Sequence, residues 1–176
     1  MGDPAVLRLG AADTPLARAL GSLLGAFGLE VHFVDADGDI PGSYWGECEA
    51  GLLDSRLIVR PDTPLHSALH EASHYICADD ARRATLDTDA GGEMLEECGV
   101  CFLSILLAAD LPGGSREQMF ADMDAWGYSF RLGSARAWFE RDADDARDWL
   151  LAHGVIDTGL RPTGRCARAG VAGGPV

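Results

Sequence analysis

Residues 67–76 read SALHEASHYI, with two histidines four positions apart and a glutamate directly after the first. We predict that this stretch lies on a helix from about Pro64 to about Cys77, because proline is favoured in the first turn of a helix. Side chains four apart share one face of a helix, so His70 and His74 are able to bind one metal ion together. The sequence therefore predicts a helix that carries a metal site.

Glu71 follows the first predicted ligand, and helix geometry rotates it by about 100° from His70. Its carboxylate is thus able to reach water on the metal without binding the metal itself. Two histidine ligands beside an acid or base are typical of the H-E-x-x-H motif. We therefore predict that Glu71 is the catalytic residue. The alternative is an amphipathic helix with two hydrogen-bonded surface histidines.

A second predicted helix, residues 93–111, is polar at its start and carries three candidates for the third ligand: Glu93, Glu96 and Glu97. A ligand helix must pack closely on the histidine helix, which favours a small residue one turn beyond the ligand. Gly99 stands three positions after Glu96. We therefore predict Glu96 as the third ligand, with Glu97 as the second choice. Such a site suits one divalent metal ion, Fe(II) or Zn(II).

The remaining pattern predicts an α+β fold, with a small sheet and a helical majority in which the HExxH helix packs on the glutamate-bearing helix, as in zincins. Apolar periodicity and capping residues predict further helices at 14–28, 79–84, 115–126 and 134–153, and strands at 30–36 and 51–59. Residues 1–156 are expected to form a single catalytic domain. Residues 157–176, rich in Gly, Arg and Ala, are expected to be a flexible tail.

The composition and charge of the chain limit the classes of partner that it is expected to bind. The chain has 176 residues, 47% of them hydrophobic, and a formal charge of −14 from 14 basic and 28 acidic residues. This balance argues against nucleic acid or an anionic membrane as partner and permits a basic protein or peptide substrate. The start of the chain lacks the pattern of a signal peptide, and no stretch is long and apolar enough to span a bilayer. We therefore expect a cytoplasmic location.

Three further features near the motif need an interpretation. We interpret His66 as a partly exposed histidine near the helix start, although it lies on the stripe of the two ligands. Cys98 and Cys101 are interpreted as small apolar residues of a buried helix. The segment 121–131, ADMDAWGYSFR, is dense in polar and aromatic groups. It either walls a pocket or ends a helix with core aromatics.

Residues 55–83, SRLIVRPDTPLHSALHEASHYICADDARR, resemble the elongation factor P hydroxylase family. In that family a strand with a similar Arg-plus-aliphatic run leads into an HExSH helix followed by an Arg-Arg pair. The matching parts here are residues 56–59, residues 70–74 and Arg82-Arg83. The resemblance implies a small metal-dependent hydroxylase with a two-histidine, one-carboxylate site that acts on a lysine of a translation factor.

The sequence is also locally similar to gluzincin-type peptidases of the ImmA kind. There the HExxH motif is followed by a helix with the pattern E-x-x-A-x-x-F. Residues 96–102, EECGVCF, match this pattern with Gly in place of Ala, which supports Glu96 as a ligand.

Three functional hypotheses remain open. The first is a hydroxylase-like iron enzyme, in which Glu71 orients a ligand or water. The second is a zinc peptidase or hydrolase, in which Glu71 is the general base. The third is a non-catalytic metal-binding adaptor. A peptidase needs an edge strand, which residues 51–59 are able to supply, whereas a hydroxylase needs a closed pocket, for which we expect residues 125–139 to provide aromatic walls.

Overall fold

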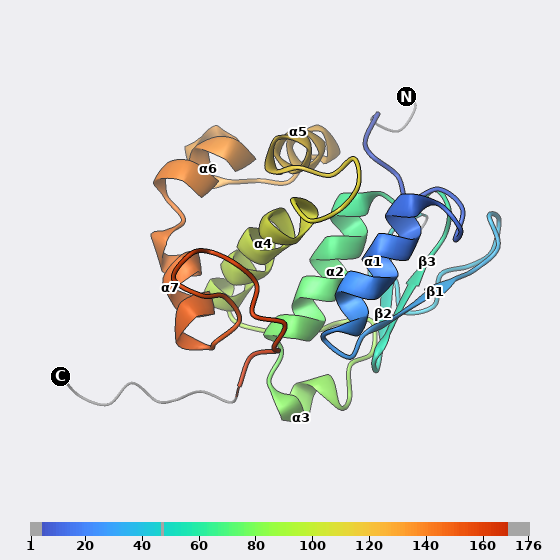
Figure 1. Cartoon of the computed structure of the whole chain (residues 1–176), viewed down its shortest axis with the longest axis horizontal. Helices are drawn as coiled ribbons and strands as arrows, with labels where there is room; N and C mark the ends of the chain where they lie inside the picture. The colour runs from blue at the N-terminus through green and yellow to red at the C-terminus, as the bar shows by residue number, and fades with distance from the viewer. Residues whose placement is uncertain (1–4, 47, 169–176) are drawn as a thin grey trace.

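The computed structural model describes residues 5–46 and 48–168, and these form the predicted α+β fold with a helical majority (Figure 1). The helices in this part of the chain are α1 (Pro15–Gly25), α2 (Leu65–Cys77), α3 (Asp80–Arg83), α4 (Met94–Ala108), α5 (Arg116–Trp126), α6 (Ala135–Arg141) and α7 (Asp144–Ala152). The strands are β1 (Glu30–Phe33), β2 (Gly51–Leu53) and β3 (Arg56–Val59). A short 3₁₀ turn, η1 (Arg131–Gly133), precedes α6.

The sheet is small, with strand order β1-β3-β2. Strand β3 lies in the middle, parallel to β1 and antiparallel to β2. The predicted strand at 51–59 is therefore two strands of a hairpin, because Asp54 takes a positive φ of 52° and turns the chain. Leu57 and Val59 of β3 are fully buried under the helices.

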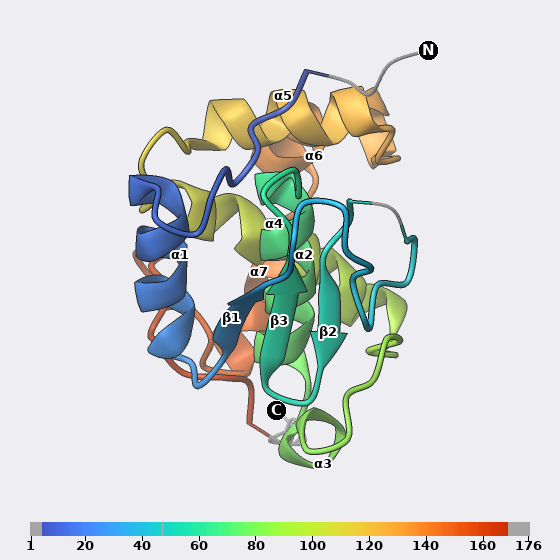
Figure 2. The ribbon, with the colours of Figure 1, turned by 90° about the vertical axis from the view of Figure 1, so that its right-hand side faces the viewer.

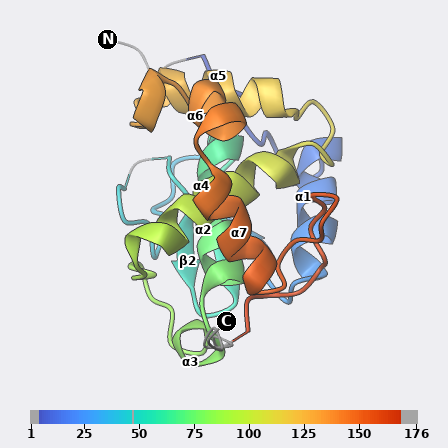
Figure 3. The ribbon, with the colours of Figure 1, turned by 90° about the vertical axis from the view of Figure 1, so that its left-hand side faces the viewer.

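The helices stack behind the sheet in successive layers (Figures 1–3). Helices α1 and α2 contact the sheet, α4 packs on the far side of α2, and α7 packs on the far side of α4. Helices α5 and α6 close one end of this stack. Helix α4 is thus covered on two opposite sides, which explains why its apolar residues run almost around the helix.

Helix α2 occupies the centre of the molecule, and most of its side chains are buried between the sheet and α4. Its first turn follows Pro64, as predicted. Neither Asp62 nor Thr63, the two polar residues before Pro64, caps the helix, because Asp62 forms an ion pair with Arg60 and the Thr63 hydroxyl accepts from the Arg60 amide. Packing rather than capping therefore fixes this helix.

Two other expectations differ from the structure. The single helix predicted at 134–153 is two helices, α6 and α7, because Asp142 and Ala143 leave helical geometry. Residues 157–168 hydrogen-bond to the body in place of the expected flexible tail. The Ala167 amide donates to the Ile76 carbonyl at 2.7 Å, and Arg83 donates to the Ala167 carbonyl. The rest of that tail, residues 169–176, lies outside the described residues.

No helix in the described ranges combines the length and the apolar character that a membrane span requires.

Candidate metal centre

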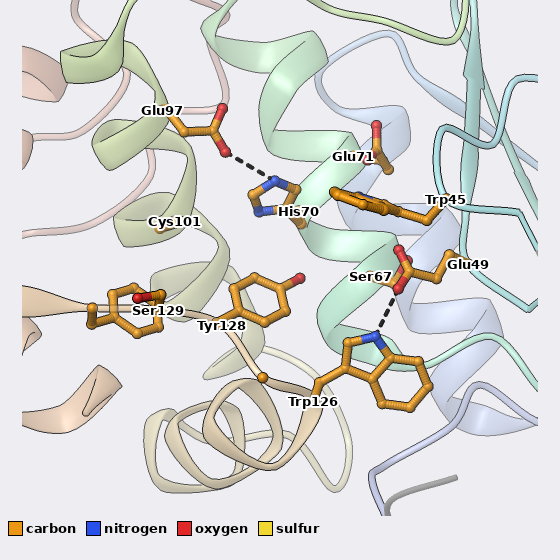
Figure 4. A pocket seen from close by; sticks show the side chains of 12 residues that line it. Trp45, Glu49, Ser67, His70, Glu71, Glu97, Cys101, Trp126, Tyr128 and Ser129 are labelled. Carbon is orange, nitrogen blue, oxygen red and sulfur yellow. Dashed lines mark hydrogen bonds and ion pairs between the residues drawn. The ribbon is translucent and has the colours of Figure 1, made fainter. Parts of the chain in front are cut away.

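Three side chains from α2 and α4, those of His70, His74 and Glu97, converge on one point. Figure 4 shows two of them, His70 on α2 and Glu97 on α4, facing each other. The Nε2 atom of His70 lies 3.2 Å from one carboxylate oxygen of Glu97, and the Nε2 atom of His74 lies 3.4 Å from the other. One donor atom from each of the three residues falls within 4.8 Å of the other two. The predicted pairing of the two histidines on one helix face is therefore present, and α4 supplies the carboxylate.

That carboxylate belongs to Glu97, the second choice, and not to Glu96. The Glu96 side chain points to another partner, Arg82, which donates to its two oxygens at 2.5 and 2.8 Å. Gly99, the small residue that favoured Glu96, lies on the face of α4 that packs on α7. A Cβ at Gly99 would lie 3.0 Å from the Trp149 ring, so this glycine makes room for α7 rather than for α2.

The pKa values of the three residues shift in different directions. Burial alone would lower the pKa of His70, but its contacts with Cys101 and Glu97 hold that pKa above its usual value. Burial and the nearby His70 lower the pKa of His74 to about 4. Burial would raise the pKa of Glu97, but its hydrogen bond with His70 and the charge of His74 hold it below its usual value. Glu97 is therefore an ionised carboxylate, the form that binds a cation.

This donor set fits a divalent ion. Two imidazole nitrogens and one carboxylate oxygen are the ligands of both zinc hydrolases and iron oxygenases. The Nδ1 atoms of His70 and His74 are buried and have no hydrogen-bond partner among the described residues. The Nε2 atoms of both rings meet the one Glu97 carboxylate. An ion at this point would bind both Nε2 atoms and a Glu97 oxygen and would leave coordination positions open.

Glu71 lies beside this point and lines a cavity of about 490 Å³ together with His70 and Glu97. Within the part of the chain that the structure describes, its carboxylate has no hydrogen-bond donor or ion-pair partner. Burial is the main reason that the pKa of Glu71 is raised to about 7. A carboxylate of this kind is able to gain or lose a proton near neutral pH, as the predicted catalytic residue must.

Aromatic residues form the opposite wall of the cavity (Figure 4). Trp126, Tyr128 and Phe130 come from the end of α5 and the segment after it, so residues of the polar and aromatic segment do wall a pocket. The same segment ends α5 at Trp126, and Tyr128 and Phe130 also pack against the core, so both interpretations of this segment apply. Its acids have structural partners: Asp122 accepts from the Leu7 amide, and Asp124 accepts from the Ala135 amide.

Two cavity residues, Trp45 and Glu49, come from a loop for which the sequence predicted no functional role. Glu49 accepts a hydrogen bond of 2.7 Å from the Trp126 indole, and Trp45 lines the cavity with 72% of its surface exposed. In the sequence this loop is marked only by a tryptophan between turn-forming residues. Its contact with α2, which brings Trp45 and Glu49 to the cavity, is visible only in the folded chain.

Two interpretations of residues near the motif need correction. His66 is not partly exposed: only 1% of its surface is accessible, and its Nδ1 lies 3.1 Å from the Tyr128 hydroxyl. Cys98 and Cys101 are half-buried rather than buried, and Cys101 lines the cavity one turn beyond Glu97. The Cys101 side chain therefore lines the site and also packs against the core.

The edge of the sheet near the site is covered by the chain itself. The Leu52 amide donates to the Gly42 carbonyl, and the Thr88 amide donates to the Leu52 carbonyl. Isolated bridges join Ser43 to Gly51 and Asp87 to Leu53 on the same strand. The outer edge of β2 therefore already pairs with other parts of the chain, and an added peptide strand could not hydrogen-bond to it there.

Searches with this chain against models of protein families, curated protein sequences and solved structures gave no match.

Proposed function

We propose that the protein is a metal-dependent enzyme in which His70, His74 and Glu97 hold one divalent ion, with α2 packed on α4 in a zincin-like arrangement. We further propose that it is a hydroxylase, as the resemblance to the elongation factor P hydroxylase family implies. Iron(II) bound by two histidines and one carboxylate supplies oxygen activation. A cytoplasmic location is part of this proposal, because the five cysteines are free, as in a reducing compartment.

The observation that carries the proposal is the combination of the triad with a cavity and a covered strand edge. The cavity is walled by Trp126, Tyr128 and Phe130, which suits a reaction that must be protected from water. An extended peptide cannot pair with β2, because residues 42–43 and 86–88 already do so. This arrangement favours the modification of one side chain over the cleavage of a bound strand.

The lining of the cavity supports a basic side chain as substrate. Glu49 and Glu71 offer carboxylates, and Trp45, Trp126 and Tyr128 offer aromatic rings. Ammonium groups bind favourably to both kinds of surface. A lysine of a protein partner, such as a translation factor, fits this chemistry, and the acidic surface of the chain would attract such a basic segment.

The test is a product analysis with defined metals. The chain is loaded with Fe(II) or, separately, with Zn(II), and incubated in air with a reductant and elongation factor P. We expect a lysine that gains the mass of one oxygen atom with the iron form only. The His74→Ala variant should form no product, while His153→Ala, a histidine stacked on Trp149 away from the site, should retain it. No oxygen gain with the iron form would contradict the hydroxylase.

A zinc hydrolase is the second candidate, and Glu71 favours it. Its carboxylate has no partner among the described residues and a pKa raised to about 7, mainly by burial, so it is suited to take a proton from water and pass it to a leaving group. Cleavage of a peptide or amide by the zinc form, without any oxygen gain, would support this candidate. In either chemistry we expect Glu71→Gln to retain the metal and lose turnover. Full activity of Glu71→Gln would contradict both.

A further inference from the structure

The hydroxyl group of Tyr128, which lines the cavity, lies within hydrogen-bond distance of the buried His66. The Tyr128 hydroxyl lies 3.1 Å from His66 Nδ1, and the two rings meet edge to face at 5.4 Å. His66 stands one helical turn before His70 on α2, which stands one turn before His74. One stripe of α2 therefore directs two imidazoles to the candidate ion and the third to Tyr128.

Tyr128 lies next to the candidate ligands as well as in the cavity. Its ring packs edge to face on the His70 ring with centroids 5.7 Å apart, and both residues line the same cavity. The backbone before it is fixed, because Gly127 ends α5 with a φ of 96° and the Tyr128 amide donates to the Met123 carbonyl. The position of this ring is thus set by both the backbone and the packing.

The hydrogen-bond donors of Trp45, Ser67, Trp126, Tyr128 and Ser129 in the lining of this cavity are neutral indole and hydroxyl groups. Its lining residues include three glutamates and no arginine, within the part of the chain that the structure describes. The Trp126 indole already donates to Glu49. A substrate oxygen next to the metal centre would therefore accept its hydrogen bond from a neutral donor. The Tyr128 hydroxyl is the donor that an imidazole, His66, holds in place.

We propose that the Tyr128 hydroxyl donates a hydrogen bond to a substrate oxygen beside the metal centre, and that His66 is the residue that positions it. His66 carries its proton on Nδ1 and donates it to the Tyr128 oxygen, which leaves the hydroxyl proton directed into the cavity. The other ring nitrogen, Nε2, has no partner among the described residues, so nothing there competes for this proton.

The protonation states agree with these roles. Burial, followed by the charges of His70 and Arg8, lowers the pKa of His66 to about 3, so its ring is neutral and carries a single proton. Burial, followed by the nearby Cys101 and Glu49, raises the pKa of Tyr128 well above its usual value. Tyr128 therefore remains a phenol that is able to donate.

The inference rests on the metal centre proposed above, so the experiment measures the two separately. Cobalt(II) is added to the full chain and its binding is followed by visible absorption. Acetohydroxamate, a small chelator with two oxygens, is then titrated into the cobalt form. We expect Tyr128→Phe to bind cobalt normally but acetohydroxamate about 10- to 100-fold more weakly, as expected for the loss of a hydrogen bond to a charged group. Tyr75→Phe, which removes a hydroxyl that donates to the Gly28 carbonyl, is the matched control and should bind both normally.

The role of His66 is tested by a double-mutant cycle. His66→Leu should weaken acetohydroxamate binding as Tyr128→Phe does, and the double variant should be no weaker than either single variant. His66→Asn, which offers both a donor and an acceptor near the Nδ1 position, should recover part of the loss. Unchanged acetohydroxamate affinity in cobalt-loaded Tyr128→Phe would overturn the inference. Failure of the unmutated chain to bind cobalt would overturn the metal centre, and this inference with it.

Discussion

At the scale of single residues, two adjacent glutamates of α4 have different partners. Glu97 faces the two histidines of α2, whereas Glu96 is 8% exposed and forms an ion pair with Arg82. The sequence predicted the two histidines and a glutamate from this turn of the helix. The sequence did not distinguish between the two glutamates, because α4 packs against α2 on one side and α7 on the other. Gly99 makes room for Trp149 of α7 and so does not mark the face that meets α2.

The Arg82–Glu96 pair leads to a prediction about stability. Glu96→Gln should lower the free energy of unfolding by about 1–2 kcal/mol, because Arg82 loses a charged partner in a half-buried position. Denaturant titration measures this change. Metal affinity should remain that of the unmutated chain, and a large loss of affinity would show that Glu96 acts at the metal after all.

His74 leads to a prediction about metal affinity. His74→Ala should weaken the binding of a divalent metal by more than about 100-fold, since even changes to residues behind the ligands cost about 10- to 100-fold. Calorimetric titration with zinc measures this affinity. His153→Ala is the control, because this histidine stacks on Trp149 and should not contribute. Equal affinities of the two variants would be incompatible with the proposed ligand set.

At the scale of elements, the long helices were predicted well and the short irregular segments were not. Helices α1, α2, α4 and α5 correspond to the helices predicted at 14–28, 64–77, 93–111 and 115–126. The break between α6 and α7 contains no glycine or proline from which it could be predicted. The hairpin turn between β2 and β3 depends on a positive φ at Asp54, which its sequence does not indicate. The loop that carries Trp45 and Glu49 reaches the site only through contacts between segments distant in the sequence.

The covered edge of β2 predicts opposite effects on stability for alanine substitutions at two glycines, Gly51 and Gly21. Gly51→Ala should lower the free energy of unfolding by about 2–3 kcal/mol or more, because a Cβ there would lie 2.1 Å from the Pro41 carbonyl oxygen. Gly21→Ala, inside α1 where the added Cβ would lie in open space beside the helix, should raise it by about 0.5–1 kcal/mol. Thermal or chemical unfolding measures both. A harmless Gly51→Ala would argue against the close cover of this strand.

At the scale of the whole molecule, the candidate centre joins the two halves of the stack. It links α2, which packs on the sheet, to α4, which packs on α7. The overall α+β class was predictable from composition and periodicity. The order of the layers was not, because it depends on which faces of nearly all-apolar helices meet.

This position predicts that metal binding stabilises the whole chain. An ion at about 100 times its dissociation constant should add about 2.7 kcal/mol to the free energy of unfolding. For a chain of this size that corresponds to a rise in Tm of about 5–10 °C. Calorimetry with added zinc, and then with excess chelator, measures the rise and its reversal. The Glu97→Gln variant should show little change on either addition.

The most direct test is the metal content of protein purified without added metal or chelator, measured by elemental analysis. Samples of the unmutated chain, Glu97→Gln and Glu96→Gln are compared. The proposed centre predicts about one equivalent of iron or zinc in the unmutated chain and in Glu96→Gln, and a large loss in Glu97→Gln. No metal in the unmutated chain, or a loss confined to Glu96→Gln, would contradict it.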